Sequence, residues 1–289
     1  MNRKYKLSQV LIVLIFMFHG ILLAQNNFQV DRKNKLFFGV YGGTNVTNVS
    51  VKDSYHVLTP TSELDLNGSK TYGKMFESWS SQFGFKLMYG FSKHISVVVE
   101  PGIYTKKFHY LTNYAWSDTI DMMDFSKEIR FNNNITYFTL PLYLRWDMLK
   151  KQFSPYIQAG GFFDFRYKSQ KAAYVDGMID GAVDVNNPDL LTAEVSWNDY
   201  VKKHQYGIAG GLGFSYFSKY VVISLEVNYK MALNPLFDDR NRYSDLSGFT
   251  TQFLDVDDRI KLGSLNAQLS LMIPISSMVY LKILRRTKY

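Results

Sequence analysis

The chain has 289 residues, with 33 Lys and Arg against 25 Asp and Glu, and it contains no cysteine. The lack of cysteine excludes disulfides, thiolate metal sites and cysteine nucleophiles together. Phe, Tyr and Trp make up 16% of the residues. They recur with the period of a strand rather than among basic loops, so the net charge of +8 does not indicate a nucleic-acid-binding protein.

The first 24 residues have the layout of a secretory signal peptide. Three basic residues precede an apolar stretch over residues 10–23, and Ala24 supplies the small residue before a predicted cleavage at Gln25. The apolar stretch is too short for a comfortable transmembrane helix. We therefore expect a signal peptide over residues 1–24, with an uncleaved N-terminal anchor as the alternative.

Eight later segments alternate large apolar residues with small or polar ones, which is the period of a β-strand. In the segment QFGFKLMYGF, which begins at Gln82, every second residue is large and apolar. The segments are, in chain order, residues 36–45, 82–91, 95–104, 135–146, 155–167, 205–217, 221–233 and 262–275. Each has about the length that an inclined strand needs to cross the hydrocarbon core of a membrane.

The connections between these segments alternate between long and short. Three are short, and four are long, at residues 46–81, 105–134, 168–204 and 234–261. This alternation places all the long loops at one end of an up-and-down barrel, as in outer-membrane barrels with short periplasmic turns and long external loops. A soluble eight-stranded barrel is the alternative, because periodicity does not say which face points inward. The glycines and charges of the polar face fit a narrow lumen better than a water-facing surface.

The predicted fold class is therefore all-β: an eight-stranded antiparallel up-and-down transmembrane β-barrel over residues 25–276. We expect it in the outer membrane of a Gram-negative bacterium, in contact with lipid and with both termini in the periplasm. We expect residues 277–289 to form a basic amphipathic tail, with a disordered end as the alternative.

Taken in order, these segments resemble the PorT-like outer-membrane β-barrel family of Bacteroidota. The resemblance covers about residues 35–276 and rests on FFGVYGGTN, GFKLMYGFSKHISVVVEPGIYTKK, YFTLPLYLRW, PYIQAGGFFDF, YGIAGGLGFSY and ISLEVNYKMALN. Thr139 departs from the family pattern, which commonly has a carboxylate there, and the chain continues past the eighth segment. The resemblance implies a small outer-membrane barrel but no single activity. The founding members are associated with type IX secretion and gliding.

Five charged residues lie on the polar faces of the predicted strands and should point into the lumen: Lys86, Glu100, Arg145, Glu226 and Lys230. We expect them to form a structural salt-bridge network, because burying an isolated charge is costly. Glu100 and Glu226 are the expected partners of Arg145 or Lys86. The alternative is an ion pathway or a catalytic carboxylate pair, which side chains filling an eight-stranded lumen disfavour.

The fourth long loop carries acidic residues at Asp238, Asp239, Asp255, Asp257 and Asp258. Carboxylate oxygens could bind calcium. The run lacks the glycine-bearing spacing of a calcium loop, so a solvated loop is the expected structure, and we predict no metal site.

Two groups of loop residues are candidates for contact with a protein partner: Met122, Met123 and Phe125 in the second long loop, and Phe249 and Phe253 in the fourth. Packing of these side chains onto the barrel rim is the alternative use.

Histidines at positions 56, 109 and 204 lie on three different predicted loops. A Ser/His/Asp enzyme would require such residues to converge, and no motif marks a nucleophile. The sequence therefore predicts no catalytic residue and no cofactor. The expected function is a structural or interaction barrel that reaches protein partners through its loops or its tail, accessory to secretion or surface assembly. The alternatives are a narrow porin and a loop-based enzyme.

Overall fold

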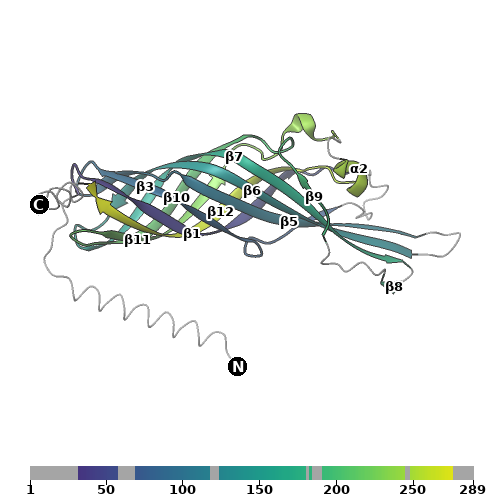
Figure 1. The fold of residues 1–289 in the computed structure, drawn as a ribbon, viewed down its shortest axis with the longest axis horizontal. Helices are drawn as coiled ribbons and strands as arrows, with labels where there is room; N and C mark the ends of the chain where they lie inside the picture. Colours follow the sequence, from purple (N-terminus) through teal and green to yellow (C-terminus); the bar gives the residue numbers. More distant parts are fainter. Residues whose placement is uncertain are drawn as a thin grey trace, which may run out of the picture.

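The structure, a computed structural model, describes residues 32–57, 69–117, 124–179, 182–183, 191–244 and 248–275. It is an elongated β-barrel from which a group of strands projects at one end (Figure 1). The predicted signal peptide and its cleavage site, the predicted tail, and Met122 and Met123 lie outside these residues. Within the described ranges, no helix is long and apolar enough to cross a membrane.

The described residues form twelve strands and two short helices. In chain order they are β1 (Leu36–Asp53), β2 (Lys70–Tyr72), β3 (Trp79–Gly90), β4 (Ile95–Val99), β5 (Gly102–Ser117), β6 (Asp124–Asp147), β7 (Phe153–Ile179), β8 (Ala182–Val183), β9 (Leu191–Ser196), β10 (His204–Phe217), β11 (Val222–Ala232), the 3₁₀ helix η1 (Asp239–Asn241), α2 (Phe249–Phe253) and β12 (Arg259–Pro274).

Antiparallel pairing closes these strands into a ring. Its order is β1, β3, β4 with β5, β6, β7, β10, β11 and β12, and β12 pairs with β1. β4 and β5 lie end to end and both pair with β3 and β6, so they share one place in the ring. Pro101, which cannot donate a backbone hydrogen bond, lies at the break. The ring thus has eight places, and the predicted fold class is correct.

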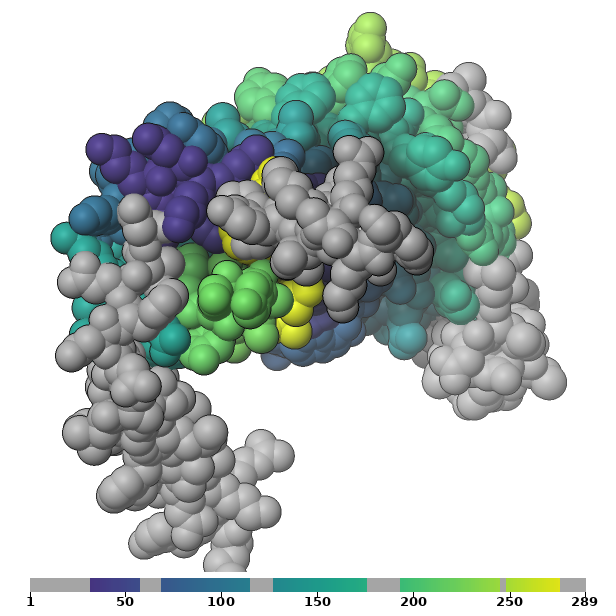
Figure 2. All heavy atoms as spheres, turned by 60° about the vertical axis from the view of Figure 1, so that its left-hand side comes forward, coloured from purple at the N-terminus to yellow at the C-terminus, as the bar shows by residue number. Residues whose placement is uncertain are grey.

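Several strands run well past their predicted ends. β5 continues to Ser117, β6 begins at Asp124 and β7 continues to Ile179, so most of the predicted loops at 105–134 and 168–204 is strand. These boundaries were wrong because the pairing of β5 with β6 continues unbroken from the barrel into its extension. The connections after β3, β6 and β10 are short, as predicted. We call this end of the barrel the turn end; Figure 2 views it with β1 (purple), β12 (yellow) and β11 (green) side by side.

Near the turn end the barrel has a polar interior and an apolar exterior. Phe85 and Leu142 point outward and are 55% and 54% exposed, whereas the inward-pointing Lys86 and Arg145 are fully buried. A water-soluble barrel would have the opposite arrangement, with its apolar residues inside. The exposed apolar belt is what a membrane-spanning barrel presents to lipid.

Toward the other end of the barrel, an additional residue on β7 changes which side chains of that strand point inward. The pairing of β6 with β7 shifts register between Thr136 and Tyr137, where Tyr167 is an additional residue on β7. Such a β-bulge changes which residues of its strand point inward. Beyond the bulge, Lys171 and Ala173 are buried, whereas before it Gln158 and Asp164 are.

Beyond the bulge the interior contains a large cluster of aromatic and aliphatic side chains. We call this part the head: β2, β8, β9, η1, α2, residues 254–258, and the ends of β5 from Phe108, of β6 up to Tyr137 and of β7 from Lys168. Its core includes Phe131 and Ile135 together with Trp197. Phe249 and Phe253 of α2 are buried in this core, so of their two predicted uses the structure shows packing rather than an exposed contact surface.

Candidate functional site

Lys86 lies at the centre of the lumen. Its Nζ atom is 2.7 Å from Oε1 of Glu100 and 2.5 Å from Oε1 of Glu226. All three side chains are buried. In the ring, β1 and β12 separate β3, which carries Lys86, from β11, which carries Glu226. The ion pair therefore crosses the interior of the barrel.

Neutral side chains complete this network. The Tyr156 hydroxyl donates to Glu226 at 2.6 Å, and Gln158 Nε2 donates to the same carboxylate at 3.1 Å. Gln268 donates to Glu226 and, at 3.0 Å, to Glu100. Buried charges are stable only when they are paired and hydrogen-bonded in this way. In this network one ammonium group is shared between two carboxylates, and neutral side chains donate to the same carboxylates.

Arg145 is placed in the lumen but away from Glu100 and Glu226. Its Nη2 atom is 2.6 Å from Asp147 Oδ1 and 2.8 Å from the Ser215 hydroxyl. Asp147 is the partner because residues two apart on a strand share a face. Sequence reasoning missed it by assigning Asp147 to the following turn.

Arg32 lies at the turn end of the barrel. The strand pattern of the sequence did not predict a role for it, because it precedes the first strand. Its Nη1 atom is 3.4 Å from Asp147 Oδ2, and Nη2 donates to the Leu149 carbonyl at 3.0 Å. The guanidinium carbon also lies 4.1 Å from the centre of the Phe217 ring. Arg32 thus connects the wall of the barrel with the turn after β6.

Lys230 is buried in the lumen, but among the described residues it makes no ion pair. Its ammonium group lies 4.6 Å from the centre of the Tyr104 ring. The nearby ion pair belongs to Lys106, whose Nζ atom is 3.0 Å from Asp164 and which also donates to Gln205 at 3.2 Å. Sequence reasoning missed Lys106 because it fell in a predicted loop.

Asp255, Asp257 and Asp258 are buried in the head, so the expected solvated loop was wrong for them, whereas Asp239 is exposed. Asp255 Oδ1 is 3.2 Å from Lys70 Nζ, and Asp257 Oδ1 is 2.8 Å from Lys171 Nζ. Both lysines are far away in the sequence, which is why the pairing could not be predicted. Across the described part of the chain, no group of three or more His, Asp or Glu side chains is arranged to hold a metal ion.

These contacts set the protonation of the two carboxyls. Burial alone would raise the pKa of Asp255, but the Lys171 and Lys70 ammonium groups outweigh it and lower that pKa to about 2. For Asp257 burial prevails: together with the neighbouring Asp255 charge, it raises the pKa despite Lys171. Asp255 is therefore the main anionic partner of the lysines.

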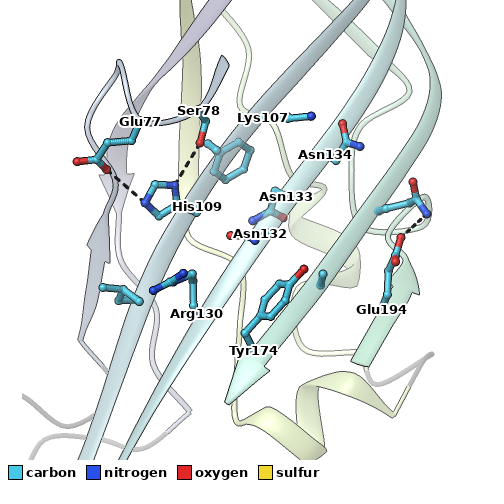
Figure 3. Close-up of a pocket in the computed structure, with 14 residues that line it drawn as sticks. Glu77, Ser78, Lys107, His109, Arg130, Asn132, Asn133, Asn134, Tyr174 and Glu194 are labelled. Atoms are coloured by element: carbon cyan, nitrogen blue, oxygen red, sulfur yellow. Dashed lines mark hydrogen bonds and ion pairs between the residues drawn. The ribbon is translucent and has the colours of Figure 1, made fainter. Parts of the chain in front are cut away.

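His109, on β5, lies between a serine and a carboxylate on the outer face of the head (Figure 3). Its Nδ1 atom is 3.2 Å from the Ser78 hydroxyl, and its Nε2 atom is 3.3 Å from Glu77 Oε2. His204 instead packs against the rings of Phe163 and Phe165. His109 thus contacts both a serine and a carboxylate, the side-chain types that a serine hydrolase combines. These two partners, Ser78 and Glu77, are adjacent in the sequence.

A polar groove of about 580 Å³ begins at this trio and crosses the outer face of the head (Figure 3). Its floor is formed by outward-facing side chains of β5, β6 and β7. Glu77 and Ser78 form one wall, and Glu194 of β9 forms the other. The floor carries two cations, Lys107 and Arg130.

Several solved structures are similar to this chain. The structure resembles the N-terminal β-barrel domain of Pseudomonas aeruginosa OprF, with 9% identity over 84% of this chain and 98% of that chain and a TM-score of 0.34. It resembles P. aeruginosa OprG, with 15% identity over 84% and 95% and a TM-score of 0.33. It also resembles Yersinia pestis Ail, with 10% identity over 82% and 98% and a TM-score of 0.28.

No curated protein matches the sequence of the chain. A family model does: residues 23–238, well over half of the chain, match the outer membrane protein beta-barrel domain. That match agrees with a ring of strands whose apolar side chains point outward and whose charged side chains are paired inside. The chain belongs to the outer membrane protein β-barrel domain family.

Proposed function

We propose that this protein is a closed, non-conducting outer-membrane barrel without catalytic activity, which acts through the surface of its head. The observation that carries the proposal is the Lys86–Glu226 ion pair, which crosses the lumen with both side chains buried. Arg32 at the turn end and the apolar core of the head lie on either side of it. An open pore would require water where these side chains pack.

The proposed orientation follows from the unequal ends of the barrel. The turn end faces the periplasm of a Gram-negative cell, with both chain termini, and the head faces outward. Outer-membrane lipid surrounds the apolar belt, while protein partners meet the head or the periplasmic side. The resemblance to PorT-like barrels of Bacteroidota supports an accessory role in type IX secretion or cell-surface assembly.

Conductance tests whether the lumen is closed. The full-length protein is refolded, its folding is checked by heat-modifiable gel migration, and it is inserted into planar bilayers beside a known porin. We expect no steady single-channel conductance. Regular conductance steps from the wild-type protein would contradict the proposal and favour the narrow porin.

Orientation is tested by labelling intact cells. Because the chain has no cysteine, a single introduced cysteine is the only thiol of this protein that a membrane-impermeant maleimide can label. We expect labelling of Asn113→Cys, in the head, and none of Lys151→Cys, in the turn after β6, until the cells are lysed. The reverse result would invert the topology.

A second candidate function is suggested by the trio at His109. Ser78 could attack an ester carbonyl while His109 accepts its proton and Glu77 holds the imidazole. Phe76 and Trp79, which flank Glu77 and Ser78 in sequence, are 60% and 58% exposed. The test is covalent labelling by a fluorophosphonate probe. Labelling that requires both Ser78 and His109, and is lost in Ser78→Ala and His109→Asn, would establish a loop-based hydrolase; its absence supports the non-enzymatic role.

A further inference from the structure

We propose that the groove on the outer face of the head binds a phosphorylated saccharide. The proposal deepens the interaction role proposed above, because it names the chemistry that the head recognises. It rests on the charge, the spacing and the hydrogen-bonding groups of the groove floor.

The strand register arranges the floor in three rows. Lys107 pairs with Asn134, which pairs with Gln170; His109 pairs with Asn132, which pairs with Ala172; and Leu111 pairs with Arg130, which pairs with Tyr174. The first and third rows are four residues apart, which is about 13 Å at a rise of roughly 3.3 Å per residue. Lys107 and Arg130 therefore mark the two ends of the floor.

Both cations are available to a ligand. Within the described residues, neither Lys107 nor Arg130 takes part in an ion pair or a side-chain hydrogen bond. The two carboxylates of the groove lie in its walls, where Glu77 contacts His109 and Glu194 accepts from Gln170. The floor thus presents two positive charges that would be neutralised by two anionic groups on one ligand.

Between the cations lie side chains that suit hydroxyl groups. Asn132 and Asn134 each offer a donor and an acceptor, as sugar hydroxyls do. Within the described residues, the buried Oδ1 atom of Asn134 has no hydrogen-bond partner. Tyr174 and Leu111 add an apolar surface at one end. This combination favours a saccharide that carries phosphates over inorganic phosphate alone.

The groove lies close to the lipid surface. Ile103 of β5 pairs with Phe138 of β6, and both are exposed, outward-facing members of the apolar belt. Lys107 follows Ile103 by four residues, so the near end of the groove is about 13 Å along the strand from the belt. Lipid headgroups extend several ångströms beyond the hydrocarbon core. The phosphorylated saccharide could therefore be a lipid headgroup or a free oligosaccharide.

The test uses the full-length protein in detergent micelles with two probes: purified lipopolysaccharide, and the phosphorylated oligosaccharide released from it by removing its acyl chains. We expect Lys107→Gln with Arg130→Gln to weaken binding by about tenfold or more, since each lost cation removes a charged hydrogen bond. Wild-type binding should also weaken as salt is added. The matched control is Lys52→Gln with Lys168→Gln, which removes the same charge at exposed sites outside the groove and should leave binding unchanged.

Each outcome decides something. Binding of lipopolysaccharide alone identifies a lipid headgroup as the source, and equal binding of both probes identifies the saccharide itself. Equal loss in the groove and control variants, or undiminished binding of an enzymatically dephosphorylated oligosaccharide, would overturn the proposal. So would a lack of binding by either probe. Bilayer conductance and cysteine labelling do not depend on this groove, so failure here is separate from failure of the proposed function.

Discussion

The part of the barrel between the turn end and the head, which we call the membrane section, is built from the same strands as the head. The two regions differ in the kind of side chain that they place inside and outside. On β6, the odd-numbered residues from Ile129 to Asp147 point inward. In the membrane section these include Arg145 and Tyr143, with Leu142 outward. In the head they include Phe131, with Asn132 outward. The same face of β6 points inward in both regions, while the kind of side chain on that face changes.

The surrounding solvent explains the difference. In the head the exterior meets water, so burying apolar side chains inside is favourable. In the membrane section the exterior meets lipid, and the narrow interior is left to polar groups. The head is therefore held largely by its apolar core, and the membrane section by backbone pairing and by a polar network.

The largest expected effect comes from removing the central cation of the lumen. Lys86→Met leaves two buried carboxylates without their partner, which should lower the free energy of unfolding by about 3–5 kcal/mol. Glu100→Ala should act in the same direction, because it removes one of the two carboxylates that Lys86 contacts. The measurement is urea unfolding in micelles, followed by heat-modifiable gel migration.

Two variants control this prediction. Lys151→Met, at an exposed position in the turn after β6, should leave stability unchanged. Lys86→Met combined with Glu100→Gln and Glu226→Gln should recover most of the loss, because a neutral interior needs no counter-charge. A Glu100→Ala protein of undiminished stability that had lost its biological activity would instead make these residues a working site.

The outer surface should distinguish the two regions next most strongly. Leu142→Lys places a charge on the lipid face and should cost about 2–4 kcal/mol. Asn113→Lys places the same charge on the outer face of the head, where water surrounds it, and should cost almost nothing. Equal costs in urea unfolding would contradict the placement of the membrane boundary between them.

The free energy of local unfolding of the head should depend on Lys171. Lys171→Met removes one of the two cations beside Asp255, and Lys70 remains, so the expected local loss is about 1–3 kcal/mol. Hydrogen exchange should show weaker protection of the segment that contains α2 and residues 254–258, with the membrane strands unchanged. Lys168→Met, on the outer face of the same strand, is the control. Loss of protection throughout the barrel would mean that the two regions unfold together.

The smallest effect expected is the pH dependence of the head. The pKa of Asp255 is lowered from 3.8 to about 2, so its stabilising contribution is present above pH 4 and is lost as the pH falls toward 2. The pKa of Asp257 is raised, so its ionisation opposes folding as the pH rises. Asp255→Asn should therefore destabilise the head at pH 7 more than Asp257→Asn does, and should remove the loss of exchange protection in acid. Equal costs would show that the two carboxyls share the lysines evenly.

The sequence by itself determined the strands of the membrane section and the face on which each residue lies. Period-two alternation places Lys86 and Glu226 on the polar faces of their strands and Leu142 on the apolar face of its strand, without any knowledge of their neighbours. The same alternation continues into the head, but there the polar face is the outer one, and the stretch was taken for loop. The period of a strand does not show whether lipid or water surrounds it.

Only the tertiary structure decided which side chains meet. The pairing of Lys86 with Glu226, of Arg145 with Asp147 and Arg32, and of Lys171 with Asp255 depends on how the ring closes. So does the meeting of His109 with Ser78 across the outer face. The bulge at Tyr167 reverses the faces of β7 through one additional residue. Strand stagger, ring size and bulges set these contacts jointly, and they are properties of the closed sheet rather than of any one strand.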